Sequence, residues 1–450
     1  MRHALALATA RVLAAAARRR GGGATSLPGL AALKLDPGFI RRRSRRLAGS
    51  VVVTGTNGKT TTARFLGAAF GAAGRSVVHN QSGSNLLRGI ASTLAAARLP
   101  SSGRKPWGVL EVDEATVPGA CRELRPRVVV VTNLFRDQLD RYGELKRTAE
   151  YLRTGLASLP KSSTVVLNAD DPLVASLGKG LKCRVRYYGI EDVSRSRPSL
   201  PHAADAVSDP KSGALLRYEA VFVGHLGHYR GTSLRRPKPQ VRLTAFRTGG
   251  AVEVRSGRQT VGLTLKLPGT YNAYNALAAL AAAEAAGIDV AKAAEAVSAT
   301  TAAFGRQESV EVGGRAVRIG LIKNPTGADE VIRTLAEAPG KKRILVLIND
   351  NFADGRDVSW LWDTDFETLR GRTERIAVGG LRGRDMALRL KYAGFPTGDL
   401  PRYGSVEEAL REELRQVPEG GTLDVLPTYT AMLELRRTLA QAGHVKHFLD

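Results

Sequence analysis

The sequence feature that most restricts the fold is a short apolar run that leads through a glycine-bounded loop into a Lys-Thr pair and a helix-forming stretch. Residues 51–53 are three consecutive valines, which predict a buried β-strand. Residues 63–70 have the composition of a helix, and the loop between reads Gly55-Thr56-Asn57-Gly58-Lys59-Thr60-Thr61. In a strand–loop–helix unit of this kind, backbone N–H groups and the helix N-terminus face an anion such as phosphate.

The side chains of this loop suit the same chemistry. Lys59 adds a positive charge, and the hydroxyl of Thr60 can hold Mg²⁺. The match is imperfect, because the full motif has a glycine where Val53 stands. The alternative is an ordinary strand-to-helix turn with a chance Lys-Thr pair. The strand before the loop and the helix after it favour the phosphate site.

Composition sets bounds on the protein class. At 450 residues the chain is long enough for about three domains, and 43% hydrophobic with 24% charged residues is typical of a soluble globular protein. Cys121 and Cys183 are too few for a disulfide framework, so we expect two buried small residues in a reducing compartment. The net charge of +25 suits nucleic acid, a nucleotide or an acidic membrane-borne substrate, or is simply a solvated basic surface.

The N-terminal 48 residues are predicted to be helical and basic. The apolar stretch 4–17 contains Arg11 and is shorter than the roughly 20 residues that a membrane span needs. Its basic cluster, residues 18–20, follows the apolar part, whereas a signal peptide has its positive charge first. We expect an amphipathic helix that can contact anionic lipid. The arginine cluster at 41–46 either does the same or is solvated.

The rest of the chain alternates strands with helices, which predicts a mostly parallel α/β fold. Polar and acidic residues follow several strands at the edge where such sheets bind ligands. Residues 191–240 are rich in Ser, Pro, Arg and Gly and predict an insertion, and a boundary falls at 305–315. The expected domains are the N-terminal segment 1–48, an ATP-binding domain 49–305 and an α/β domain 306–450. The expected strands are 51–53, 76–79, 109–114, 128–133 and 164–172, the last ending in a polar, acidic turn. Sheet-like segments are expected at 241–266, and beyond the boundary the expected strands are 343–348, 375–378 and 422–426.

Three separated segments resemble the Mur ligase superfamily. They are the loop 55–61, the helix start Asn272-Ala273-Tyr274-Asn275-Ala276 and the segment Gly305-Arg306-Gln307-Glu308. The resemblance implies a central P-loop ATPase domain, a C-terminal Rossmann-like α/β domain and an ATP-dependent C–N ligase. It implies that Thr60 and Glu111 hold Mg²⁺. It also implies that ATP is bound by Gly55, Asn57, Gly58, Lys59, Thr60, Thr61, Asn275 and Arg306.

Within that superfamily the chain resembles the MurT family from about residue 28 to 440. The segments that carry this are 133–144, 167–172 and 349–363. That family is the ligase part of lipid II isoglutaminyl synthase and works with a class I glutaminase, GatD. The resemblance implies that ATP phosphorylates the α-carboxylate of D-glutamate in the lipid II stem peptide, and that ammonia then gives D-isoglutamine. It also implies that Asp357 completes the glutaminase triad across the interface. The other loop aspartates, Asp350, Asp354 and Asp363, are expected to form caps and turns.

Three departures from these families qualify the resemblance. Gln138 stands where many Mur ligases have a histidine Mg²⁺ ligand, as it does in MurT-like proteins, and no counterpart of the carbamylated lysine is visible. MurT-like proteins carry a four-cysteine zinc ribbon in the insertion, but Asp209, Ser212 and the segment near Gly231 lack cysteines here. His225 and His228 alone are weak zinc ligands, so we expect no zinc and a degenerate ribbon held by packing or left loose.

The expected function is therefore amidation of lipid II in peptidoglycan biosynthesis, in the cytoplasm or at the inner face of the membrane. One alternative is a diverged stand-alone Mur-type ligase for another carboxylate. The other is a basic ATP-dependent nucleic-acid binder, which the net charge of +25 favours and the acidic strand ends oppose.

Overall fold

The computed structural model describes residues 1–19, 26–80, 84–100, 102–137, 145–201, 204–300, 306–396 and 398–445. The chain divides into two compact units, and each is treated by itself. The first contains Met1–Phe135, Glu144–Leu200 and Asp205–Thr301, and the second contains Arg136–Gly143, Pro201–Ala204 and Ala302–Asp450.

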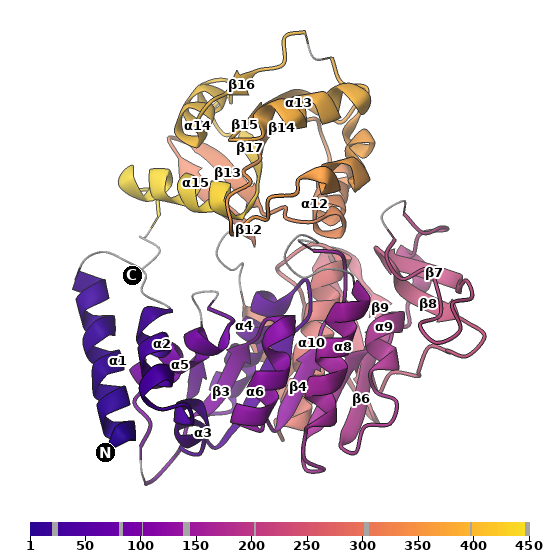
Figure 1. Cartoon of the computed structure of the whole chain (residues 1–450). Helices are drawn as coiled ribbons and strands as arrows, with labels where there is room; N and C mark the ends of the chain where they lie inside the picture. Colours follow the sequence, from indigo (N-terminus) through magenta and orange to yellow (C-terminus); the bar gives the residue numbers. More distant parts are fainter. Residues whose placement is uncertain are drawn as a thin grey trace. The chain divides into compact units, whose positions relative to one another are not determined.

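The three valines of the opening strand lie in β1 (Gly49–Thr54), inside a nine-stranded sheet of the first unit (Figure 1). The sheet order is β11-β10-β9-β6-β5-β4-β1-β3-β2, parallel from β2 to β9 and antiparallel from β9 to β11. The predicted parallel α/β fold is confirmed. The other strands are β2 (Val77–His79), β3 (Trp107–Glu111), β4 (Val128–Val131), β5 (Thr164–Asn168), β6 (Arg184–Ile190), β9 (Val241–Phe246), β10 (Ala251–Ser256) and β11 (Gln259–Thr264).

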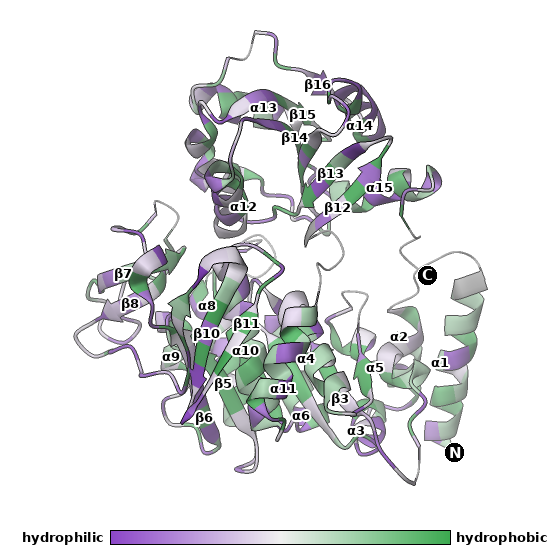
Figure 2. Cartoon of the chain, turned by 180° about the vertical axis from the view of Figure 1, so that it is seen from behind, coloured by the Kyte–Doolittle hydropathy of each residue, from purple (hydrophilic) through white to green (hydrophobic). Residues whose placement is uncertain are grey.

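Helices cover both faces of this sheet, which explains why its strands are apolar on both sides. Val52 belongs to the core that includes α5 and α6, whereas the equally buried Val51 and Val53 point to the opposite face, where α4 contacts β1. The alanine-rich α10 is almost entirely buried against α4 and the strands and has hydrophobic colours in Figure 2. The helices are α1 (Arg2–Arg19), α2 (Leu27–Leu35), α3 (Phe39–Ser44), α4 (Lys59–Ala72), α5 (Leu87–Ala96), α6 (Val117–Leu124), α8 (Leu145–Ala157), α9 (Pro172–Ser176), α10 (Thr270–Ala285) and α11 (Val290–Ala299).

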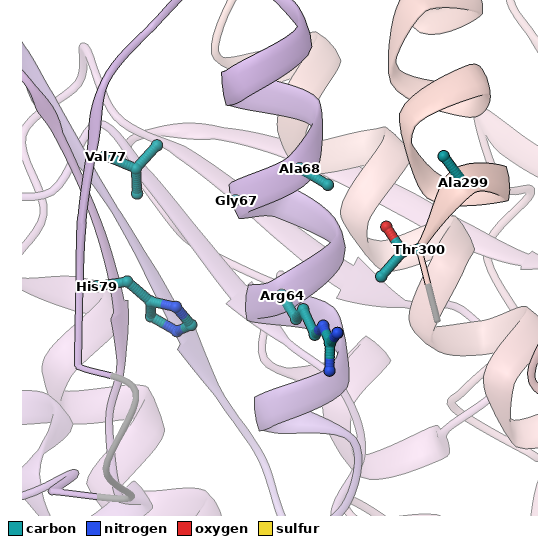
Figure 3. Close-up of a pocket in the computed structure, with 7 residues that line it drawn as sticks. All are labelled: Arg64, Gly67, Ala68, Val77, His79, Ala299 and Thr300. Carbon is teal, nitrogen blue, oxygen red and sulfur yellow. The ribbon is translucent and has the colours of Figure 1, made fainter. Parts of the chain in front are cut away.

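A cavity of about 470 Å³ borders α4 in the first unit (Figure 3). Its walls come from α4, β2 and the C-terminal end of α11, and they are made of small residues with two basic side chains. The lining residues are Arg64, Gly67, Ala68, Val77, His79, Ala299 and Thr300.

The N-terminal helices are part of the first unit and pack into its core. Ala6, Ala10 and Ala32 are fully buried in the same core as α5. The arginine cluster that follows is not uniformly solvated, which corrects the expectation for Arg43. That side chain is buried and donates hydrogen bonds to the carbonyls of Leu94 and Ala97. Its burial lowers its pKa to about 10, and the nearby charges of other arginines act in the same direction.

Cys121 and Cys183 are free thiols in the buried interior, as predicted. None of the helices that the structure describes combines the length and the apolar run needed to cross a bilayer.

The insertion contains a two-stranded hairpin, β7 (Arg217–Val223) and β8 (Leu226–Arg230), and is not held by packing alone. The buried carboxylate of Asp209 accepts hydrogen bonds from the N–H groups of Lys211 (2.9 Å), Ser212 (3.3 Å) and Ser233 (2.8 Å). The Ser233 hydroxyl donates a further bond of 2.9 Å. One aspartate thus joins two turns of the insertion. The expectation was a segment either held by packing or left loose, and these hydrogen bonds add to the packing.

The two histidines of the insertion have separate places in the fold. Nε2 of His228 lies 2.7 Å from the carbonyl of Ile190. His225 is fully buried against the Phe135 ring, and its Nε2 lies 3.5 Å from a carboxylate oxygen of Asp171. In the described part of the chain, no three His, Cys, Asp or Glu side chains gather as metal ligands do.

The second unit is built on a six-stranded sheet of order β12-β13-β17-β14-β15-β16, antiparallel only between β12 and β13. Alternate residues of β14 enter two cores, with Ile344 and Val346 on one face and Leu345 and Leu347 on the other. The predicted strands at 343–348, 375–378 and 422–426 are confirmed, whereas β12, β13 and β16 were not predicted. The elements are β12 (Arg306–Val312), β13 (Arg315–Gly320), α12 (Pro325–Glu337), β14 (Lys342–Leu347), β15 (Thr373–Gly379), α13 (Gly383–Tyr392), β16 (Arg402–Tyr403), α14 (Val406–Arg415), β17 (Thr422–Pro427) and α15 (Tyr429–Gln441).

Candidate functional site

The loop between β1 and α4 has a backbone shape that requires glycine at two positions. Gly55 and Gly58 have φ angles of 117° and 84°, in the left-handed region that L side chains rarely adopt. A Cβ atom on Gly55 would lie 2.3 Å from the Thr132 hydroxyl oxygen, and one on Gly58 would lie 2.0 Å from Oδ1 of Asn275. Gly58 also caps α4, so the N–H groups at the start of that helix are open to an anion.

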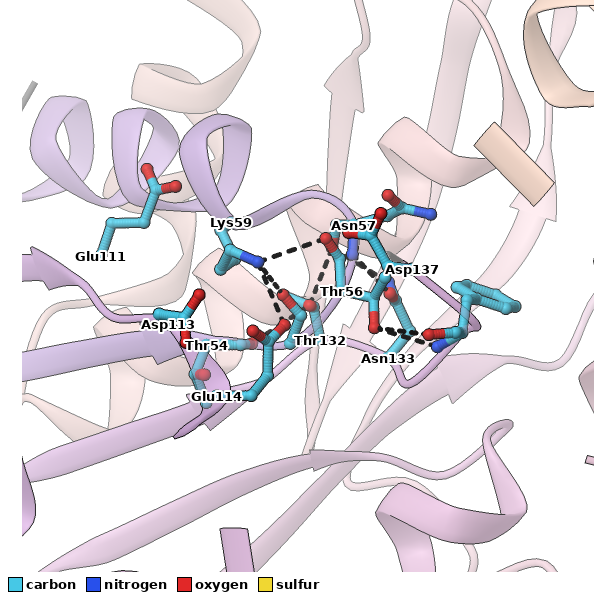
Figure 4. A network of polar contacts seen from close by, with 12 residues as sticks. Thr54, Thr56, Asn57, Lys59, Glu111, Asp113, Glu114, Thr132, Asn133 and Asp137 are labelled. Carbon is cyan, nitrogen blue, oxygen red and sulfur yellow. Dashed lines mark hydrogen bonds and ion pairs between the residues drawn. The ribbon is translucent and has the colours of Figure 1, made fainter. Parts of the chain in front are cut away.

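Two residues that follow β4 hold the middle of the loop (Figure 4). The side-chain oxygen of Asn133 accepts a 2.8 Å bond from the N–H of Asn57, and its amide nitrogen donates to the Asn57 carbonyl at 3.1 Å. The Thr132 hydroxyl donates to the same carbonyl at 2.8 Å. Both peptide groups of Asn57 are therefore engaged, which fixes the loop before any ligand binds.

Lys59 begins α4 and is 9% exposed, so its charge needs partners. Its ammonium group lies 3.1 Å from Oε1 of Glu114 and donates to the carbonyls of Gly55 and Thr56 (Figure 4). These contacts hold the positive charge directly over the loop, where a bound phosphate would be neutralised.

Thr60 and Glu111, the two predicted magnesium ligands, lie together. The Thr60 hydroxyl donates a 2.9 Å hydrogen bond to Oε2 of Glu111. Asn80 fixes the Glu111 backbone by two bonds of 2.8 Å, one to its carbonyl and one from its N–H. Hydroxyl and carboxylate oxygens at this spacing suit Mg²⁺, which usually takes one or two protein ligands and fills the rest with water and phosphate oxygens.

Asn275 comes from α10 and meets the loop from the opposite side. Its Oδ1 accepts a 3.4 Å bond from the hydroxyl of Thr62, and its amide nitrogen donates to Oδ1 of Asn272 at 3.2 Å. Thr61 is buried in the first turn of α4. Arg306 begins β12 in the second unit, and its side chain lies outside the described part of the structure, as does Gln138.

Asp357 lies in the second unit, in the loop after β14, and its side chain is exposed. Its Oδ1 accepts one hydrogen bond, of 2.8 Å, from the N–H of Ser359. The neighbouring Asp354 is buried and anchors the loop by accepting bonds from the N–H groups of Thr430 (2.8 Å) and Asn351 (3.2 Å). Burial raises the pKa of Asp354, although these hydrogen bonds act in the opposite direction.

The structure thus brings most of the predicted nucleotide and magnesium residues to one place in the first unit. The sequence reasoning did not identify the residues that hold this site in shape. Their positions in the sequence could have indicated them, because each follows the carboxyl end of a parallel strand or opens the predicted helix after residue 270. They are Asn80, Glu114, Thr132, Asn133 and Asn272.

Comparisons with known proteins agree with this geometry. The Mur ligase middle domain matches residues 53–283, and the MurT ligase C-terminal domain matches residues 321–432. The structure of a pseudomurein peptide ligase type C from Methanothermus fervidus has a TM-score of 0.66 at 23% identity, covering 88% of this chain and 79% of that one. The MurF ligase from Thermotoga maritima in complex with ADP has a TM-score of 0.62 at 16% identity, covering 91% and 84%. The fold and the phosphate loop therefore define the class as that of the Mur ligases.

One relative narrows this class. The chain is 35% identical over 435 residues to the lipid II isoglutaminyl synthase (glutamine-hydrolyzing) subunit MurT of Streptococcus pneumoniae, with 94% of each chain covered. The chain belongs to the MurT family. The family resemblance and the fold class predicted from the sequence are both confirmed.

Proposed function

We infer that this chain is the ligase subunit of a lipid II isoglutaminyl synthase and amidates the α-carboxylate of D-glutamate in the stem peptide. The observation that carries this is the phosphate loop, with Lys59, Thr60 and Glu111 in place, in a chain that aligns with a MurT subunit along 94% of both lengths. The product would be D-isoglutamine, used in peptidoglycan synthesis.

The proposed reaction has two steps because a carboxylate is a poor electrophile. ATP first phosphorylates it to an acyl phosphate, and ammonia then attacks the carbonyl carbon and displaces phosphate. The protein's task in phosphoryl transfer is positioning and charge neutralisation. The N–H groups of the loop, Lys59 and Arg306 would bind the triphosphate, while Asn275 keeps Gly58 in place. Thr60 and Glu111 would hold Mg²⁺, which supplies further positive charge beside the phosphates.

The ammonia would come from a GatD-type class I glutaminase partner. A triad aspartate must orient a histidine beside a nucleophilic cysteine, so an aspartate supplied by a different subunit has to be exposed. Asp357 meets that condition on a loop anchored by Asp354. Exposed apolar side chains occur in the same unit and would suit a protein partner. They are Phe352 (78% exposed), Trp362 (51%), Leu381 (64%), Leu388 (47%) and Tyr392 (70%).

The substrate is lipid-linked, so peripheral contact with the inner face of the membrane is part of the proposal. The first 35 residues contain no Asp or Glu, and α1 exposes Leu5 and Val12 by 59% and 67%. An apolar helix face flanked by basic residues alone suits anionic lipid.

A second candidate is a stand-alone ligase for another carboxylate. The observation that favours it is the insertion, where Asp209 and its hydrogen bonds stand in the place of the family's cysteines. A changed insertion would fit a changed substrate.

The test is amidation of lipid II in detergent micelles by this chain with ATP and Mg²⁺, first with ammonium chloride and then with glutamine and a GatD-type glutaminase. We expect amide and ADP in equal amounts with ammonia alone, and glutamine-driven product only when the partner is added. ATP binding without amide under either condition would reject lipid II as the acceptor and support the second candidate.

A further inference from the structure

The cavity beside α4 has no role in the proposed nucleotide site. Arg64 enters it from α4, His79 from the end of β2 and Thr300 from the residue after α11 (Figure 3). The rest of its wall is small, with no side chain larger than Val77. A recess of about 470 Å³ is large enough for part of a peptide.

This cavity lies next to the proposed magnesium ligands. Thr60 and Arg64 are four residues apart on α4, so they share one face of that helix. Thr60 donates to Glu111 on β3, and β3 is the neighbour of β2, where His79 pairs in register with Val109. A group bound in the cavity would therefore be close to the phosphates that the loop holds.

The polar groups of the cavity suit an anion. A guanidinium group can bind a carboxylate with two parallel hydrogen bonds, and the cavity contains the guanidinium group of Arg64. The His79 ring offers an N–H donor when its proton is on Nε2. Among the described residues, none hydrogen-bonds its Nε2 atom. The Thr300 hydroxyl donates to the Ala296 carbonyl at 2.8 Å, so Arg64 and His79 are left as the donors toward an anion.

We propose that this cavity binds the acceptor peptide by a carboxylate, with Arg64 as its ionic partner and His79 as a hydrogen-bond donor. The inference rests on the proposed function and adds an acceptor subsite to it. It makes Arg64 and His79 determinants of acceptor binding rather than of ATP binding. The small residues Gly67, Ala68 and Ala299 leave the room that the peptide occupies.

The first test fills the cavity without touching its polar groups. Gly67 and Gly71 both lie in α4, and a Cβ atom on either meets no other atom within 4 Å. Only Gly67 lines the cavity, so Gly71→Leu is the matched control for Gly67→Leu. With ammonia as donor, we expect Gly67→Leu to raise the KM for lipid II about tenfold or more. The KM for ATP should stay within about twofold, and Gly71→Leu should leave both constants within about twofold of the wild type.

The second test removes the charge. Arg64→Gln should raise the KM for lipid II roughly ten- to a hundredfold, the usual value of a hydrogen bond to a charged group, with little change in the KM for ATP. Arg88→Gln, an exposed position on α5, removes the same charge from the same unit and should have no effect.

Two results would overturn this inference: an unchanged KM for lipid II in both cavity variants, or an equal rise in the KM for ATP, which would make the cavity part of the nucleotide site. Failure of the proposed function is distinct, because the wild type itself would then form no amide with ammonia.

Discussion

Gly58 shows how strictly a single residue controls this site. It combines a φ of 84° with an approach that would bring a Cβ to 2.0 Å from Asn275. Gly58→Ala should therefore cost about 1–2 kcal/mol in backbone strain and displace Asn275 as well. We expect ATP affinity, measured by calorimetry with Mg²⁺, to fall at least about tenfold.

Gly71→Ala is the control for this prediction. It lies in the same helix with open space around it, so alanine should raise helix stability by about 0.5–1 kcal/mol and leave ATP affinity unchanged. Wild-type affinity in Gly58→Ala would mean that the loop can adopt another backbone shape.

A second prediction at this scale concerns Asp357. If it orients the histidine of a partner's triad, Asp357→Asn should reduce glutamine-driven amidation by at least about a hundredfold, because an amide does not stabilise the imidazolium. Ammonia-driven amidation should be unchanged, since the hydrogen bond that Asp357 accepts within the described part of the chain is local, from the N–H of Ser359. The exposed Asp399 of the same unit provides Asp399→Asn as a control. Equal loss with both nitrogen donors would assign Asp357 to the ligase reaction or to folding instead.

The residues of the phosphate loop could be predicted because their chemistry is contained in one short stretch of sequence. The residues that shape the loop could not be found in the same way. Asn133 and Asn275 reach Asn57 and Gly58 only because β4 and α10 lie beside β1 and α4 in the fold. Arg64 and His79 likewise line one cavity only because α4 and β2 lie close together in the fold. No local sequence pattern predicts that arrangement.

At the scale of elements, the carboxylate of Asp209 holds two turns of the insertion together. Burial alone would raise the pKa of Asp209, but the N–H groups of Lys211 and Ser233 and the Ser233 hydroxyl hold it at about 2. Because the folded-state pKa is below the ordinary value of 3.8, this stabilisation is present above about pH 4 and is lost as the pH falls towards 2.

We therefore expect hydrogen exchange in residues 206–235, corrected for the intrinsic rate, to increase between pH 4 and 2 in the wild type. Asp209→Asn should show that increase already at pH 7, because an amide has one acceptor oxygen where the carboxylate has two. Exchange elsewhere in the first unit serves as the internal control. Unchanged protection in Asp209→Asn would show that the hairpin β7–β8 holds the insertion by packing after all.

There is an identifiable reason why the strands β12 and β13 were not predicted. Both β12 and β13 alternate apolar with polar residues, as in Val310-Glu311-Val312 and Val317-Arg318-Ile319, which is a strand pattern. β12 lies within the expected domain boundary at 305–315, and β13 begins where that boundary ends. Buried parallel strands such as β4 and β14 were easier to predict, because they are continuous apolar runs.

At the scale of the whole molecule, the exposed apolar side chains of the second unit offer surface to a partner chain. Trp362 and Tyr392 pack edge to face with ring centroids 5.4 Å apart, and Leu388 lies one turn from Tyr392 on α13. Aromatic side chains of this kind, packed in an apolar surrounding, carry much of the binding energy of protein interfaces. A glutaminase that supplies ammonia to a ligase has to bind the ligase tightly, because otherwise the ammonia escapes into solution.

Leu388→Asp should accordingly weaken binding of the GatD-type partner by at least about tenfold in a titration, because it places a charge in an apolar contact. Glutamine-driven amidation should fall in proportion at limiting partner, while ammonia-driven amidation stays at the wild-type rate. Leu215→Asp is the matched control, since Leu215 is 78% exposed in the insertion of the first unit. If Leu215→Asp weakened binding of the partner and Leu388→Asp did not, the glutaminase would bind the insertion rather than the exposed apolar side chains of the second unit.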